Sequence, residues 1–205
     1  DPDNSYRAEN DLTGRTVVMY AGNVGLSQSL DLVVEAARRF RDRGRDDVVF
    51  VINGGGSALA GLRESARGLD NLRFVGMQPR ERLPEVLAAG DLHLVPLRTG
   101  LARSSVPSKL YSILAAGRPV LASVDGGTEV ATTIERAGAG VSVPPEDADR
   151  FVSALDRMLS DRTALAAMGA SGRAFVEGWV SPAAVGAAYE QLFESVRADR
   201  LRAGA

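Results

Sequence analysis

Short apolar runs alternate with longer amphipathic stretches along the chain as far as residue 147. The apolar runs predict strands at 17–22, 48–54, 71–76, 91–97, 119–124 and 139–144, and the amphipathic stretches predict helices at 30–44, 58–68, 81–90, 108–116 and 127–137. This alternation is typical of a parallel sheet with helices on both faces. We therefore expect an α/β fold with a Rossmann-like, doubly wound sheet of six parallel strands.

Beyond residue 147 the pattern is helical only, with helices expected at 148–161, 162–178 and 181–200. Residues 1–14 are polar and predict a linker that enters the domain, and residues 15–180 have a length suited to one domain. Residues 181–205 would form a separate C-terminal helix. Because the chain begins with Asp1 and not with Met, we expect it to be a piece of a longer polypeptide.

Charge and composition narrow the class of protein. The formal charge of −2 lacks the basic surplus of a nucleic-acid-binding protein, so we expect no nucleic-acid partner. The sequence has no cysteine, which excludes a disulfide scaffold and Cys-ligated zinc and fits a reducing cytoplasm. No apolar run approaches the roughly 18 residues that a membrane-spanning helix needs.

Glycine and short polar residues follow several of the predicted strands. They form the loops Gly22–Gly25, Gly54–Gly56 and Gly76–Pro79, and the polar stretch 104–109 (SSVPSK) begins a later helix. In a parallel sheet these loops meet at the carboxyl ends of the strands, where ligands bind. Glycine lets backbone approach a ligand, and helix N-termini attract anions. Each loop alone is explained by a plain turn, but together they favour a nucleotide site.

Two common nucleotide motifs are absent. A dinucleotide-binding protein has G-x-G-x-x-G after its first strand and an acid at the end of its second strand. Here the first loop is GNVG and the second strand ends in Ile52-Asn53-Gly54 without a carboxylate. The sequence also lacks G-x-x-x-x-G-K-[ST], so neither an oxidoreductase nor a P-loop protein is favoured.

The segments YAGNVGLSQSLDLVVEAA, VFVINGGG, LRFVGMQPRERLPEVLAAGDLHLVPL and SSVPSKLYSILAAGRPVLAS, with the closing W and YEQLF, carry a resemblance over about residues 12–195. The chain resembles the C-terminal, donor-binding half of a GT-B glycosyltransferase of the retaining family 4 type. Its SQSL and PSK segments are similar to those of the branch of the family that assembles colanic acid, O-antigen and capsule. In the family the last helix crosses back toward the N-terminal half, which this chain lacks.

The resemblance implies a donor and an acceptor. The donor would be a nucleotide diphosphate sugar, most simply a UDP-sugar, used without cofactor or metal. The acceptor would be a cell-surface glycan or a lipid-linked glycan, bound through the missing N-terminal half. The parent protein would then be a cytoplasmic glycosyltransferase, peripherally associated with the inner face of the membrane. The isolated chain would bind nucleotide without turnover.

The same resemblance implies three sets of donor contacts. The nucleotide diphosphate would meet Gly22, Asn23, Gly25, Gln28, Ser105, Val106, Ser108 and Lys109. The base and ribose would meet Gly54, Gly76, Met77 and Ser112. The donor sugar would meet Arg103 and Ser104, and the catalytic residues stay unassigned.

Four positions depart from the family pattern. Asn23 and Gln28 stand where the family has an arginine and a lysine that face the diphosphate, and Ser104 and Ser112 stand where it has two glutamates. Four positions that are charged in the family thus hold neutral, polar residues in this chain. A non-catalytic nucleotide-binding or interaction domain with a decayed site is therefore the alternative. A nucleotide-sugar epimerase of the same fold would need carboxylates and histidine in the cleft, which we do not find.

Lys109 offers a replacement for the lost cations. It begins the helix that follows Pro107, where the helix dipole also favours an anion. The simpler alternative makes Ser108 a plain N-cap and Lys109 a solvated side chain. We expect His93, the one histidine, to pack inside a strand, and Arg98 to be solvated unless it approaches the phosphates.

Overall fold

The computed structural model describes residues 2–101, 107–179 and 182–203, with side chains as far as residue 197. It contains one six-stranded sheet in the order β3-β2-β1-β4-β5-β6, and every pairing of neighbouring strands is parallel. The strands are β1 (Thr16–Ala21), β2 (Val48–Asn53), β3 (Leu72–Val75), β4 (Leu92–Pro96), β5 (Val120–Ser123) and β6 (Gly140–Val143). The predicted fold class is confirmed.

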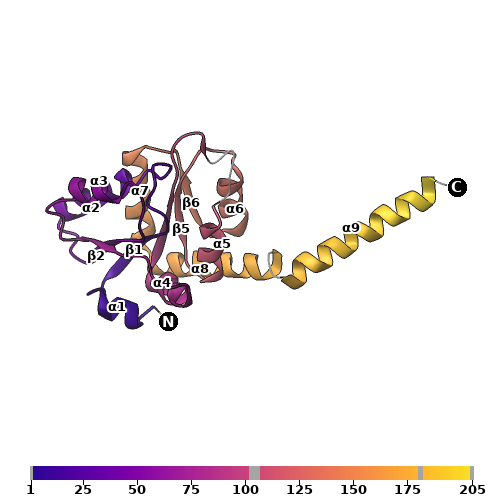
Figure 1. Ribbon diagram of the computed structural model, residues 1–205, viewed down its shortest axis with the longest axis horizontal. Helices are drawn as coiled ribbons and strands as arrows, with labels where there is room; N and C mark the ends of the chain where they lie inside the picture. The colour runs from indigo at the N-terminus through magenta and orange to yellow at the C-terminus, as the bar shows by residue number, and fades with distance from the viewer. Residues whose placement is uncertain (1, 102–106, 180–181, 204–205) are drawn as a thin grey trace.

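Helices cover both faces of this sheet (Figure 1). They are α1 (Ser5–Glu9), α2 (Asp31–Asp42), α3 (Leu59–Ser65), η1 (Arg80–Arg82), α4 (Leu83–Ala89), α5 (Lys109–Ala115), α6 (Glu129–Ala137), α7 (Ala148–Ser160), α8 (Arg162–Trp179) and α9 (Pro182–Ala203). Side chains alternate across a strand, so Val18 and Tyr20 of β1 join the core under α2 and α7, whereas Met19 joins the core under α1 and α4. The carboxyl ends of the strands thus lie between these layers.

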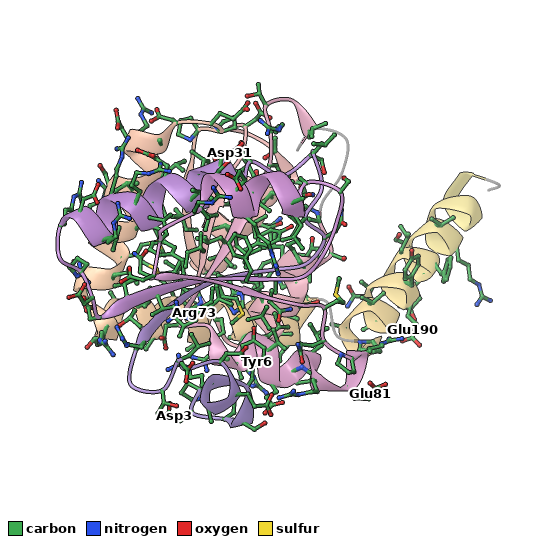
Figure 2. All side chains as sticks on the ribbon, turned by 60° about the vertical axis from the view of Figure 1, so that its left-hand side comes forward. Asp3, Tyr6, Asp31, Arg73, Glu81 and Glu190 are labelled. Carbon is green, nitrogen blue, oxygen red and sulfur yellow. The ribbon has the colours of Figure 1, made fainter. Side chains whose placement is uncertain are left out.

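The N-terminal segment differs from the simple linker that its polarity suggests. Asn4 caps α1 by accepting a hydrogen bond from the Arg7 backbone N–H, and Tyr6 and Leu12 are fully buried. Tyr6 lies on the side of α1 that faces the sheet (Figure 2). Arg7 Nη2 also forms a 2.7 Å ion pair with Asp91 Oδ2. The segment therefore belongs to the core of this domain, and its connection to a preceding domain stays a prediction.

The last helix extends far from the body of the domain (Figure 1). Its large apolar side chains are exposed, including Tyr189, Leu192 and Phe193. Extra C-terminal helices were expected and are present, but the predicted crossing toward a missing half stays a prediction. Within the described residues, no helix combines the length and apolar character needed to cross a membrane.

Candidate functional site

A pocket of about 520 Å³ opens at the carboxyl edge of the sheet. The ends of β1 and β2, the segment from β3 into α4 and the first turns of α5 surround it. Its lining comprises Ala21, Gly22, Asn23, Gln28, Asn53, Met77, Gln78, Pro79, Arg80, Leu83, Val86, Leu87, Ser108, Lys109 and Ser112. This is where a doubly wound sheet binds its ligand, as the loop pattern predicted.

The structure brings seven of the predicted site residues together around this pocket: Gly22, Asn23, Gln28, Met77, Ser108, Lys109 and Ser112. Gly25, Gly54 and Gly76 do not line it. Arg103, Ser104, Ser105 and Val106 lie outside the described residues. The predicted contacts of these seven other residues stay predictions.

Two of the non-lining glycines support the first loop. The Gly25 backbone N–H donates to Gln28 Oε1 at 3.0 Å, which holds the side chain that replaces the family's lysine. A Cβ on Gly54 would lie 1.9 Å from the Gly22 carbonyl oxygen, and Gly54 has a φ of +152°. Only glycine therefore lets the second loop approach the first so closely.

Lys109 crosses the pocket from α5 to the end of β1. Its Nζ donates to Tyr20 Oη at 2.7 Å and lies 3.9 Å from the centre of the Tyr20 ring. Burial lowers the pKa of this ammonium group to about 8. No carboxylate of the described residues forms an ion pair with it. These surroundings differ from the solvated Lys109 of the alternative, because the charge is partly buried and, among the described residues, contacts a hydroxyl and a ring.

Neighbouring residues fix the position of this ammonium group. A Cβ on Gly22 would lie 2.9 Å from Lys109 Nζ, so a side chain at Gly22 would displace the cation. Tyr20 Oη in turn donates to the Asn23 carbonyl oxygen at 2.5 Å. Burial raises the pKa of the Tyr20 phenol, so the hydroxyl stays protonated and keeps both contacts. Lys109 is thus linked through Tyr20 to the first loop.

The start of α5 does not contain the simple cap that the alternative required. Ser108 occupies the N-cap position, but its side chain makes no capping hydrogen bond and is exposed. Leu110, Ile113 and Leu114 form the buried face of α5. Among the described residues, Ser112 Oγ has only a long, 3.5 Å contact with the Ser108 carbonyl oxygen, so its hydroxyl can turn to a ligand.

The charge of the pocket suits an anion. Lys109 and Arg80 are the charged residues of its described lining, and no described lining residue is a carboxylate. Arg80 is exposed at the rim and was missed by the sequence analysis. Within the described residues, no cluster of three or more His, Cys, Asp or Glu side chains is placed to hold a metal ion. Among the described lining residues, the positive charge comes from Lys109 and Arg80.

One buried polar residue of the pocket was also missed. Asn53 ends β2, is 4% exposed, and its Oδ1 accepts a 2.8 Å hydrogen bond from Tyr6 Oη. In the sequence it drew attention only as a position without a carboxylate. An asparagine at the end of an otherwise apolar, buried strand was the available signal, because a buried amide needs partners.

His93 and Arg98 lie away from this pocket. His93 is fully buried, as expected, and its Nε2 donates to the Leu87 carbonyl oxygen at 2.9 Å. Arg98 is paired and not simply solvated: Nη1 contacts Glu146 Oε1 at 2.8 Å and Nε donates to the Leu26 carbonyl oxygen at 2.8 Å. Arg98 thus links the chain just after the first loop to Glu146, outside the pocket.

Comparison with known proteins decides the family. The model of the family described as glycosyl transferases group 1 matches residues 15–161. The chain belongs to this family. A similar relative is WcaI of Escherichia coli strain K12, a glycosyl transferase named for colanic acid biosynthesis, which is 36% identical over 148 residues. That match covers 71% of this chain and 36% of the relative.

Solved structures agree on the fold. Sucrose-phosphate synthase from Thermosynechococcus elongatus superposes with a TM-score of 0.74 at 23% identity, over 94% of this chain and 48% of that one. Alr3699/HepE of Anabaena, solved in complex with UDP, has a TM-score of 0.72 at 14% identity, over 94% of this chain and 51% of that one. The group 1 chain thus has the Rossmann-like fold of one GT-B half, and it spans little more than a third of the WcaI relative, 36%.

Proposed function

We propose that this chain is the donor-binding half of a retaining glycosyltransferase that takes a sugar from a UDP-sugar and transfers it to a cell-surface or lipid-linked glycan. The observation that carries the proposal is the desolvated Lys109 ammonium group at the carboxyl edge of the sheet, in a pocket whose described lining contains no carboxylate. The UDP bound by the Anabaena neighbour and the colanic acid name of the relative support the donor and acceptor classes.

The two ends of the pocket suit the two ends of a nucleotide. Lys109 and Arg80 would meet the diphosphate, together with backbone near Gly22. Met77 and Leu83 supply apolar surface for a flat base, and the Ser112 hydroxyl would meet the ribose. The donor sugar would extend toward residues 103 and 104, as the family resemblance implies.

The proposed reaction breaks the bond between the sugar's anomeric carbon and the β-phosphate oxygen. The acceptor hydroxyl forms the new bond on the same face of the sugar and passes its proton to the departing phosphate. UDP leaves with the bonding electron pair. Lys109 would stabilise the charge that grows on the β-phosphate, because a fixed cation in a poorly solvated site acts more strongly than one in water. The acceptor would come from an N-terminal half, on the cytoplasmic face of the membrane.

A non-catalytic nucleotide-binding or interaction domain with a decayed site is the second candidate, supported by the neutral residues Asn23 and Gln28 in the first loop. Titration calorimetry of the chain with UDP, GDP, ADP and uridine separates the two. We expect heat with UDP, weaker binding of the other three, and no change on adding EDTA. Absence of heat with millimolar UDP would support the decayed site. Equal binding of all nucleotides would reject only the assignment of uridine as the nucleoside and would leave nucleotide binding in place.

Lys109→Ala tests the central contact. A hydrogen bond to a charged group is worth about 1.5–3 kcal/mol, so UDP affinity should fall about tenfold or more. Uridine lacks the diphosphate, and its weaker binding should hardly change. Ser112→Ala should weaken both ligands by a similar factor if its hydroxyl meets the ribose. An unchanged UDP affinity in Lys109→Ala would contradict the proposed role.

A further inference from the structure

We infer that Asn53, oriented by Tyr6, reads a carbonyl oxygen of the nucleobase and so makes the pocket select uracil over cytosine. The inference rests on the proposed function, because it assumes that a nucleotide occupies the pocket. It assigns a specificity role to two residues outside the predicted site.

The Asn53 side chain has one satisfied end and one open end. Oδ1 accepts from Tyr6 Oη at 2.8 Å, and no acceptor among the described residues bonds to Nδ2. The fully buried unpaired side-chain atoms of the described residues are Asn71 Oδ1, His93 Nδ1 and Arg118 Nε. Asn53 Nδ2 is not one of them, so it reaches the pocket that Asn53 lines. A side chain that is 96% buried therefore offers its free donor to the ligand space.

Tyr6 fixes which end of the amide faces the pocket. In the structure the Tyr6 hydroxyl donates to the carbonyl end of the Asn53 amide, which turns the amide nitrogen the other way. Burial raises the pKa of the Tyr6 phenol, so the hydroxyl keeps the proton that it donates. The helix that carries Tyr6 is itself anchored to α4. Glu85 Oε1 accepts from the Ser5 hydroxyl and, at 3.2 Å, from the Tyr6 backbone N–H, and the Glu85 carbonyl oxygen accepts from Asn4 Nδ2 at 2.9 Å. The donor is thus held in place before any ligand binds.

The position of Asn53 in the sheet places this donor near the base. Its register partners are Ala21 of β1 and Val75 of β3. Val75 comes two residues before Met77, which begins the apolar side of the pocket. Asn53 also lies on the sheet face covered by α4, because it follows Val49 and Val51 of that face in steps of two residues. The Asn53 amide therefore lies on the α4 face of the sheet, with the apolar part of the pocket, whereas Tyr20 lies on the opposite face.

A fixed N–H donor distinguishes pyrimidines. Uracil has a carbonyl oxygen at the position where cytosine has an amino group, and a donor facing an amino group leaves both unpaired. A site built to hydrogen-bond one group rejects an analogue that cannot form the bond, since the buried polar group is left unsatisfied. Because this cost is about 1–3 kcal/mol, UDP should bind at least about tenfold more tightly than CDP.

The test measures UDP and CDP affinities by calorimetry for the chain and three variants. Asn53→Asp replaces the donor with an acceptor of the same shape, so UDP should weaken about tenfold and CDP should bind at least as well as UDP. Tyr6→Phe frees the amide to turn either end to the pocket, so the ratio of the two affinities should fall toward one. Tyr20→Phe is the matched control on the other sheet face and should change both affinities by one factor.

The outcomes separate the two proposals. If the chain binds neither UDP nor CDP, the proposed function is rejected. If it binds both equally, or if folded Tyr6→Phe and Asn53→Asp variants keep its preference for UDP, the base-reading role is rejected while nucleotide binding stands. Equal weakening of UDP and CDP by Asn53→Asp would also overturn this role, because it would indicate a contact with ribose or phosphate.

Discussion

Two basic side chains in this molecule, the fully buried His93 and the partly buried Lys109, have opposite surroundings. His93 lies inside β4, fully buried, and donates one hydrogen bond to a backbone carbonyl. Lys109 lies at the mouth of α5, with its ammonium group against a hydroxyl and a ring and beside an open pocket. Burial lowers the pKa of both groups, His93 to about 4 and Lys109 to about 8.

The two side chains differ in their charge at pH 7: His93 is neutral and Lys109 is mostly protonated. His93 avoids the cost of burial by losing its proton, so a neutral imidazole can serve the core as an ordinary hydrogen-bonding side chain. Lys109 remains mostly protonated at pH 7, so the folded protein carries the cost of a partly desolvated charge. A cost of that kind is expected where an anion can recover it on binding. The comparison therefore separates a structural basic residue from a functional one.

The largest expected effect is a loss of folding stability at acid pH, caused by protonation of His93. Its pKa is lower in the folded state than the ordinary 6.5, so between pH 6.5 and 4 the unfolded chain binds more protons than the folded one. The free energy of unfolding therefore decreases as the pH is lowered through this range. Denaturant titrations should show a loss of about 2 kcal/mol between pH 7 and pH 5. His93→Gln should flatten this dependence. A wild-type stability that is constant over the range would contradict the neutral, buried histidine.

The next effect is a loss of UDP affinity at alkaline pH, caused by deprotonation of Lys109. Its free-state pKa of about 8 means that most molecules carry the charge at pH 7 and few carry it at pH 9. If the charge contributes tenfold to affinity, UDP binding should weaken about fivefold between pH 7 and 9. The dependence should vanish in Lys109→Ala, which has no proton to lose. Calorimetry at the two pH values measures it, and an equal slope in both proteins would assign the effect to another group.

The sequence predicted the fold more completely than the site. Hydrophobic periodicity depends on local residues, so it located every strand of the described chain and every helix after α1 within a few residues, but it missed α1 itself. The contacts that define the pocket join distant segments: Lys109 meets Tyr20 89 residues away, and Tyr6 meets Asn53 47 residues away. Periodicity contains no information on such pairs. The polarity of residues 1–14 likewise concealed Tyr6, whose burial depends on where α1 meets α4.

The smallest effect, Lys109→Met, tests whether the burial of charge is a cost to folding. Methionine has a similar length and flexibility without the charge, and Tyr20 Oη keeps its bond to the Asn23 carbonyl oxygen. Thermal and denaturant unfolding at pH 7 without ligand should show a gain of about 1 kcal/mol, while UDP affinity falls as in Lys109→Ala.

The pH dependence of that gain makes the test specific to the charge. Lys109 loses its proton in the folded state near pH 8, whereas the unfolded chain keeps it up to the ordinary 10.5. The wild-type protein therefore recovers stability relative to Lys109→Met as pH rises through this range, and the gap between them should narrow. A gap that is constant from pH 7 to 10 would attribute the gain to packing. A destabilised Lys109→Met would mean that the contacts with Tyr20 outweigh desolvation, and Lys109 would then be structural, like His93.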